Sequence, residues 1–175
     1  MSTALALGQT APSFSLPTTA GGTAALEEMP PGPVVVTFWC NHCPYVRAWE
    51  DRFMALATEY AGRAAFVAIN ANDAERYPTD SFEDMAARAA ERGYPFPYAH
   101  DATQRVARAY GAERTPEVFV LDADRRVAYH GTIDDSHELE GVSASYLREA
   151  LDAVLEGRSP EVTDTAPVGC TIKWK

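Results

Sequence analysis

The chain has few cysteines and few basic residues, and each shortage excludes a class of protein. Three cysteines among 175 residues are too few for a disulfide-rich scaffold, and their odd number rules out complete pairing. Only 15 basic residues stand against 25 acidic ones, which leaves a formal charge of -10. Such an acidic chain is unsuited to phosphate-rich partners, so we expect neither nucleic acid nor a membrane surface as a partner.

Long apolar segments and targeting signals are also missing. The longest apolar runs, 34–36 and 38–40, are far shorter than the roughly 20 residues of a membrane-spanning helix. Residues 1–7 carry neither a basic leader nor a clear cleavage site, so the sequence predicts no signal peptide. These absences favour the reducing cytoplasm, where two closely spaced cysteines indicate redox chemistry or metal binding more often than a structural disulfide.

The apolar content of the chain is sufficient for one hydrophobic core. With 46% apolar residues and 175 residues in all, it has the size of a single domain, which we assign to 1–175. Glycine, proline, threonine and alanine are frequent in residues 1–32, a composition typical of an extended N-terminal lead-in with a small hairpin. Residues 158–175 follow the last predicted helix, and we expect them to form a C-terminal tail packed on the body.

The hydrophobic periodicities predict an α/β fold with a central mixed β-sheet flanked by helices. Residues 34–39 are β-branched and aromatic without polar alternation, as in a strand covered on both faces. Asp101, with Gln104 three residues later, predicts a capping box at the start of a short helix. No element is assigned to 96–100. In chain order the expected elements are strand 34–39, helix 45–60, strand 66–69, helix 81–92, short helix 101–110, a hairpin of strands 118–121 and 127–129, and helix 143–156.

A CxxC motif lies where the first long strand passes into the first long helix. Cys40 and Cys43 enclose His42 in the sequence CNHC. The N-terminus of a helix offers unpaired amide donors and the positive end of the helix dipole, and both stabilise a thiolate and lower the pKa of its cysteine. A protonated His42 would add to this effect. Because the thiolate is the attacking species in disulfide exchange, the placement predicts redox chemistry.

Several sequence strings, taken in order, carry a family resemblance. Thr115 and Pro116 open the predicted hairpin, and together with CNHC they resemble the thioredoxin fold, in which a cis-proline lies beside the redox cysteines. Residues 8–16, GQTAPSFSL, are similar to the opening of the redoxin branch that includes peroxiredoxins. The strings TFWCNHCPY, INAND, YPTDSFEDM, RTPEVFVLD and PVGCTIKWK resemble a bacterial thioredoxin-like family grouped with the AhpC/TSA-type redoxins.

The resemblance implies a thioredoxin fold with a redoxin-type N-terminal extension and the activity of a thiol-disulfide oxidoreductase. Cys40 and Cys43 would be catalytic, acting on protein or small-molecule disulfides through a mixed disulfide, with a thiol reductant as partner and no cofactor. The alternative is a peroxiredoxin-like thiol peroxidase acting on peroxides, with Cys43 as the peroxidatic cysteine and Cys40 or Cys170 as the resolving one. The supporting positions around the motif are His42, Pro44, Thr115 and Pro116.

Two alignments of the motif leave the identity of the attacking cysteine open. In one, CNHC matches the CxHC of disulfide isomerases, and Cys40 is the nucleophile. In the other, Cys43 takes that place and is followed by Pro44, which is favoured as the first residue of a helix and would make Cys43 the cap. We favour Cys43 because of the helix dipole. Thioredoxins carry a buried acid on the preceding strand where this chain has Thr37, so another group or water must handle the proton.

Metal binding is the main alternative to redox chemistry for a CxxC motif. A zinc site would need two further ligands, and the sequence contains no second closely spaced pair. No glycine-rich loop follows a predicted strand, so nothing indicates a nucleotide cofactor. We therefore expect neither a metal nor a cofactor.

The C-terminal tail contains the third cysteine. Apolar residues alternate with polar or small ones between positions 168 and 174, and this period of two predicts an extended segment with one face against the body. The inward-facing residues would be Val168, Cys170, Ile172 and Trp174. Cys170 is then either a buried structural thiol or a resolving cysteine, and the second role requires its Cα to come within roughly 7 Å of that of Cys40 or Cys43.

Overall fold

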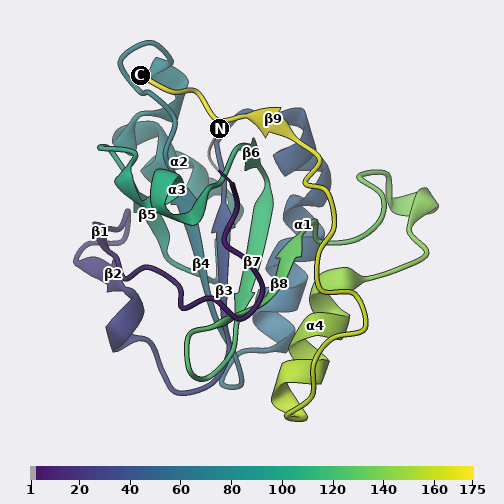
Figure 1. Ribbon diagram of the computed structural model, residues 1–175. Coiled ribbons are helices and arrows are strands. Elements are labelled where there is room, and N and C mark those ends of the chain that lie inside the picture. The colour runs from purple at the N-terminus through teal and green to yellow at the C-terminus, as the bar shows by residue number, and fades with distance from the viewer. Residues whose placement is uncertain (1–2) are drawn as a thin grey trace.

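A five-stranded mixed sheet carries the core of the protein (Figure 1). The structure, a computed structural model, describes residues 3–175. In sheet order the strands are β5 (Tyr98–His100), β4 (Ala65–Asn70), β3 (Val34–Phe38), β7 (Glu117–Leu121) and β8 (Val127–Gly131). β3 lies at the centre, parallel to β4 and antiparallel to β7. β5 extends the sheet in parallel beyond β4, and β8 completes a hairpin with β7.

Helices cover both faces of this sheet. α1 (Pro44–Glu59) and α4 (Tyr146–Leu155) pack on one face, together with Met85 of α2 (Phe82–Arg92). α3 (Arg105–Tyr110) packs on the other face with the N-terminal segment. The predicted α/β class, a central mixed sheet flanked by helices, is therefore confirmed.

β3 is buried along its whole length because the sheet is covered on both sides. Val35 belongs to the core under α1, whereas Val34 and Val36 belong to the core under α3. All five residues of the strand are buried. This two-sided burial explains why its sequence shows no polar alternation.

An apolar stripe seats α1 on the sheet. Trp49, Phe53 and Leu56 recur at helical spacing, and none is more than 4% exposed. The ring of Phe53 lies 5.0 Å from that of Trp39, the residue that follows β3. α1 is therefore held directly beyond the end of β3, and only residues 39–43 separate the two elements.

The N-terminal segment forms a small antiparallel hairpin of β1 (Ser15–Pro17) and β2 (Thr23–Ala25). In residues 3–175 there are also three short 3-10 helices: η1 (Leu26–Glu28), η2 (Pro78–Asp80) and η3 (Leu139–Gly141). Within residues 3–175, none of the helices has the length and apolar character needed to cross a membrane.

β5 and the start of α3 differ from the sequence-based prediction. β5, for which no element was expected, is a three-residue strand that exists because β4 offers it a parallel partner. The capping box predicted from Asp101 and Gln104 is wrong. Gln104 adopts a left-handed φ of 63°, and α3 begins one residue later. Asp101 instead accepts a hydrogen bond from the backbone amide of Ala107 at 2.9 Å.

The last helix is shorter than predicted. α4 begins at Tyr146 rather than at position 143. The Asp135 carboxylate accepts hydrogen bonds from the backbone amides of Ser143 and Ala144, at 2.9 and 3.1 Å. These two bonds hold the segment before Tyr146 in a loop.

The C-terminal tail adds a short strand beside the CxxC motif. β9 (Cys170–Thr171) pairs antiparallel with β6 (Arg114–Thr115), and in this register Cys170 is opposite Thr115 (Figure 1). Earlier in the tail, Asp164 forms a bridge to His130 of β8. The imidazole of His130 also contacts the Asp164 carboxylate at 2.7 Å, so side chains as well as backbone bind the tail to the sheet.

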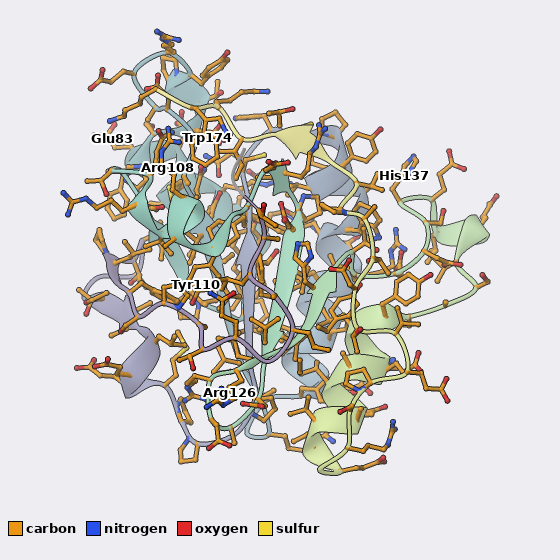
Figure 2. The ribbon with its side chains drawn as sticks, in the orientation of Figure 1. Glu83, Arg108, Tyr110, Arg126, His137 and Trp174 are labelled. Carbon is orange, nitrogen blue, oxygen red and sulfur yellow. The ribbon has the colours of Figure 1, made fainter. Side chains whose placement is uncertain are left out.

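The alternation predicted for the tail holds only in part. Ile172 is 2% exposed. The guanidinium carbon of Arg108 lies 4.4 Å from the centroid of the Trp174 ring, and Figure 2 labels these two side chains beside each other. Val168, in contrast, is 43% exposed, so the prediction that it faces inward is wrong. The reason is that β9 contains only two residues, and the extended pairing does not reach back to position 168.

Gly169 sets how closely the tail approaches β6. A Cβ at this residue would lie 2.1 Å from the Thr115 carbonyl oxygen, a contact that only a backbone shift can relieve. We expect Gly169→Ala to lower the free energy of unfolding by about 1–3 kcal/mol, because overpacking against backbone is destabilising. Urea unfolding followed by tryptophan fluorescence measures this change.

Gly141→Ala is the matched control. Its nearest obstacle would be the side-chain oxygen of Ser136, which can rotate away. We expect a change within about 0.5 kcal/mol for this variant. Equal losses for the two substitutions would contradict the role given to Gly169.

Candidate active site

The CxxC motif forms the turn between β3 and α1. Cys43 is the N-cap residue of α1, and Pro44 is its first helical residue. The Cys43 carbonyl accepts the first helical hydrogen bond, from the Arg47 amide at 3.0 Å. A proline is tolerated at this position because the first amides of a helix have no intrahelical acceptor. Cys40 and Cys43 are free thiols, 3% and 5% exposed.

Thr115 touches both sulfurs of the motif. The Cys40 Sγ lies 3.4 Å from the Thr115 hydroxyl, and the Cys43 Sγ lies 3.3 Å from the Thr115 carbonyl oxygen. Thr115 is 2% exposed and precedes Pro116 through a cis peptide bond. Segments that are 72 residues apart in the sequence therefore meet at the motif.

Several donors converge on the sulfur of Cys43. A hydrogen bond from the Cys40 thiol has the largest effect and lowers the pKa of Cys43, while burial opposes it. Hydrogen bonds from the Cys170 thiol, the Val46 amide and the Cys170 amide lower this pKa further. The balance brings the pKa of Cys43 to about 5. At neutral pH this sulfur is therefore a thiolate.

The pKa of Cys40 shifts in the opposite direction to that of Cys43. Its hydrogen bond to Cys43, followed by burial, raises the pKa of Cys40 well above its ordinary value. The hydrogen bond with Thr115 works against this rise, and the negative charges of Cys43 and Asp80 add to it. The two cysteines thus share one proton, with Cys43 charged and Cys40 neutral.

A buried polar network holds the turn between the two cysteines. Asp80 is 6% exposed, and its carboxylate accepts a hydrogen bond from the Asn41 backbone amide at 2.9 Å. The same carboxylate accepts hydrogen bonds from the side chains of Asn70 and Asn72, each at 3.0 Å. The Tyr98 hydroxyl donates to the Asn41 side chain at 2.7 Å. Both the backbone and the side chain of Asn41 are therefore fixed.

Sequence reasoning missed this network, although its members occur in two of the strings that carry the resemblance. Asn70 and Asn72 lie in INAND, and Asp80 lies in YPTDSFEDM. The available signal was a group of amide side chains at the end of a buried strand. What the sequence did not show is that the carboxylate of Asp80, from a separate segment, turns inward to meet them.

Thr37 occupies the place at which thioredoxins carry a buried acid. Its hydroxyl donates to the Glu117 backbone oxygen at 3.3 Å. The carboxylate whose charge acts on the cysteine pair is Asp80, which raises the pKa of Cys40. The carboxylate charge that acts on Cys40 therefore comes from Asp80 rather than from an acid on β3.

His42 lies on the outside of the motif. It is exposed, and its Nδ1 accepts a hydrogen bond from the Arg47 guanidinium at 3.1 Å. The groups that lower the pKa of Cys43 are thiols and backbone amides, and His42 is not among them.

Cys170 completes the group of cysteines. In the β6–β9 pairing it is opposite Thr115, the residue that both motif sulfurs contact. Its side chain is partly exposed and packs against the core cluster that contains Cys40 and Cys43. Burial and then the hydrogen bond to Cys43 raise the pKa of Cys170 to about 11. The structure therefore brings all three cysteines together.

A hollow of about 440 Å³ lies next to α1. Its walls include Trp49 of α1, Val168 of the tail and His137, which Figure 2 shows on the loop that precedes α4. The ring of Tyr45, two residues after the motif, lies 5.1 Å from that of His137. Across residues 3–175, no three His, Cys, Asp or Glu side chains are grouped as a metal ion requires.

The chain matches known redoxins in sequence. Residues 7–130 match the AhpC/TSA family. Over 130 residues the chain is 30% identical to the thioredoxin-like protein YneN of Bacillus subtilis, an alignment that covers 74% of this chain and 70% of that protein. The resemblance drawn from the sequence strings is therefore confirmed.

Solved structures confirm the thioredoxin fold. An uncharacterized conserved protein from Geobacillus kaustophilus is 43% identical with a TM-score of 0.92, covering 97% of this chain and 93% of that one. Peroxidoxin BcpB from Mycobacterium tuberculosis is 28% identical with a TM-score of 0.66, covering 86% and 96%. A Chlorobium tepidum protein provisionally named thiol:disulfide interchange protein DsbE is 26% identical with a TM-score of 0.62, covering 73% and 85%.

Cys43 should react as a thiolate well below the pH at which an ordinary thiol does. With a pKa of about 5, its alkylation rate should reach half of its maximum near that pH, whereas a free thiol does so near roughly 8.5. Iodoacetamide labelling mapped by mass spectrometry measures this profile. A wild-type midpoint above about pH 8 would contradict the arrangement described here.

A pair of Cys40 variants tests the cause of the shift. Cys40→Ala removes the donor that lowers the pKa of Cys43 most, so the midpoint of alkylation should move to higher pH. Cys40→Ser keeps a donor at the same place, so the midpoint should move less in this variant. Identical profiles for the two variants would show that this hydrogen bond is not the main cause.

Asp80→Asn should loosen the turn of the motif. The new amide group would face donors from Asn41, Asn70 and Asn72, which leaves at least one of these groups unpaired. We expect a loss of about 1–3 kcal/mol in the free energy of unfolding. Asp84→Asn, on the exposed first turn of α2, is the control and should change it by less than about 0.5 kcal/mol. Equal losses would contradict the role of Asp80.

Proposed function

Because the chain belongs to the AhpC/TSA family, we propose that it is a thiol-disulfide oxidoreductase in which Cys43 attacks and Cys40 resolves. One observation carries the proposal: both sulfurs of the turn that precedes α1 contact Thr115, beside the cis peptide bond to Pro116. The pKa values of the pair agree with it. The pKa of Cys43 is lowered to about 5 while that of Cys40 is raised. One cysteine is therefore ready to attack at neutral pH, and the other holds its proton until the second step.

The first step is attack of the Cys43 thiolate on one sulfur of a substrate disulfide. A bond forms between the Cys43 Sγ and that sulfur, and the substrate disulfide breaks. The other substrate sulfur leaves as a thiolate and takes a proton from solvent. The product is a mixed disulfide at the N-terminus of α1.

The second step belongs to Cys40. In the mixed disulfide Cys43 carries no charge, so the hydrogen bond that raises the pKa of Cys40 most is lost. Cys40 then gives up its proton more easily and attacks the Cys43 Sγ, which releases the second substrate thiolate. Two electrons have passed to the substrate, and a thiol reductant must return the Cys40–Cys43 disulfide to the dithiol.

Protein and small-molecule disulfides are the substrates we propose. The hollow next to α1 offers aromatic and polar surface from Trp49 and His137, against which a segment attached to the reacting sulfur can lie. We place the reaction in the cytoplasm, where thiol reductants keep such a pair reduced.

A thiol peroxidase is the second candidate, favoured by the similarity to peroxidoxin BcpB over 86% of this chain. The Cys43 thiolate would attack a peroxide oxygen, become a sulfenic acid and release hydroxide or an alkoxide. The thiol of Cys40 or Cys170 would then condense with the sulfenic acid, forming a disulfide and water.

Cysteine variants test the proposed oxidoreductase. We expect the wild type to catalyse reduction of a small aromatic disulfide by dithiothreitol, and Cys43→Ser to be slower by about 100-fold or more. Cys40→Ser combined with Cys170→Ser, which removes both thiols next to Cys43, should accumulate the mixed disulfide, which mass spectrometry detects. Thr58→Ala, at the far end of α1, should keep the wild-type rate. Full activity in both cysteine variants would end the proposal.

Hydrogen peroxide separates the two candidates. For an oxidoreductase, the reduced protein should consume peroxide no faster than free cysteine does. Rapid sulfenic acid formation at Cys43 with many turnovers would instead favour the peroxidase. Peroxide consumption and mass analysis of the cysteines provide the two measurements.

A further inference from the structure

The sulfur of Cys43 has a thiol on each of two sides. Cys40 approaches from the turn, and Cys170 approaches from the tail, where it packs against the core cluster that contains Cys40 and Cys43. The backbone register supports this proximity independently, because Cys170 is opposite Thr115 and the Thr115 carbonyl lies 3.3 Å from the Cys43 Sγ. Cys170 therefore lies next to Cys43 as well as against the core.

Contacts made by the residues before and after Cys170 fix its position. Before it, Gly169 lies so close to β6 that an added Cβ would come within 2.1 Å of the Thr115 oxygen. After it, the Ile172 amide donates to the Glu113 carbonyl at 2.9 Å, and the Lys173 amide donates to the Asn72 side chain at 2.9 Å. Asn72 also belongs to the Asp80 network, so the tail and the CxxC turn share one support.

The three cysteines differ in their access to solvent. Cys40 and Cys43 are 3% and 5% exposed, whereas Cys170 is partly exposed. A disulfide between the first two would present little sulfur surface to an external reductant. Access to the attacked sulfur is one of the factors that set the rate of disulfide exchange.

We propose that Cys170 is a third redox cysteine, through which an external dithiol returns the oxidised protein to its reduced state. The proposal rests on the Cys40–Cys43 chemistry proposed above and adds the route by which electrons enter.

In the Cys40–Cys43 disulfide Cys43 carries no charge, so its hydrogen bond and negative charge no longer raise the pKa of Cys170. In the first exchange Cys170 loses its proton to solvent, and the resulting thiolate attacks the Cys43 Sγ of that disulfide. A Cys43–Cys170 bond forms, the Cys40–Cys43 bond breaks, and Cys40 leaves as a thiolate that takes up a proton. The number of disulfides is unchanged. The disulfide has moved from the buried pair to one that includes the accessible sulfur.

In the second exchange a thiolate of the external dithiol attacks the Cys170 Sγ. Cys43 leaves as a thiolate, which is favourable because its low pKa makes it a good leaving group. The second thiol of the reductant then attacks its own sulfur in the mixed disulfide and releases Cys170. The reductant ends as a disulfide, and all three cysteines of the protein are reduced.

Disulfide mapping in Cys40→Ser tests the proximity without any assay of activity. After mild oxidation with diamide we expect this variant to form an intramolecular Cys43–Cys170 disulfide. Cys170→Ser under the same conditions should form Cys40–Cys43. Cys43→Ser should form little Cys40–Cys170 disulfide, because Cys43 is the shared partner of the other two cysteines.

Re-reduction kinetics test the route of electrons. Oxidised wild type and oxidised Cys170→Ser are mixed with dithiothreitol, and tryptophan fluorescence follows the loss of the disulfide. We expect reduction of Cys170→Ser to be slower by about tenfold or more. Thr171→Ser, the next residue on β9, is the matched control and should match the wild type.

The outcomes separate this proposal from the function proposed above. Formation of Cys43–Cys170 in Cys40→Ser, together with slow re-reduction of Cys170→Ser, supports the third redox cysteine. One contrary outcome is that Cys170→Ser forms the Cys40–Cys43 disulfide while Cys40→Ser forms no Cys43–Cys170 disulfide. Another is that Cys170→Ser is re-reduced as fast as the wild type. In either case Cys170 is a structural thiol, and only this inference falls. If neither disulfide forms, both proposals fall.

Discussion

The structure of the candidate active site depends on the negative charge on the sulfur of Cys43. The residue is 5% exposed, and a charge so far from water persists only if hydrogen-bond donors replace the solvent. The donors come from three separate segments, namely Cys40 in the turn, Val46 in α1 and Cys170 in the tail. The turn, the helix and the tail must therefore all be in place before the thiolate is stable.

The groups that position these donors form one connected system. Asn72 donates to the Asp80 carboxylate, which also holds the Asn41 amide of the turn. The side-chain oxygen of Asn72 accepts a hydrogen bond from the Lys173 amide of the tail. A displacement of the tail would thus reach the CxxC turn through a single side chain. Through this coupling the C-terminal residues form part of the candidate active site.

Much of the fold could be predicted because the signals are local. β3 and α1 follow from a run of buried β-branched residues and from an apolar stripe at helical spacing, and both patterns lie within one element. The elements that sequence reasoning missed depend on distant partners. β5 needs β4 beside it, and α3 starts at Arg105, after Gln104, whose side chain donates to the Ala71 and Lys173 carbonyls. The exposure of Val168 likewise depends on where the β6–β9 pairing ends.

The sequence by itself determined the α/β class, the redoxin resemblance and the position of a CxxC motif at the start of a helix, because spacing and residue type along a few turns of chain are enough for these features. Only the tertiary structure decided which groups surround the sulfurs. Thr115, Asp80 and Cys170 come from segments far apart in the sequence, and their contacts with the motif arise from strand register and tail docking. A thiol pKa depends on the donors and charges within a few ångströms, and the folded chain alone places them there.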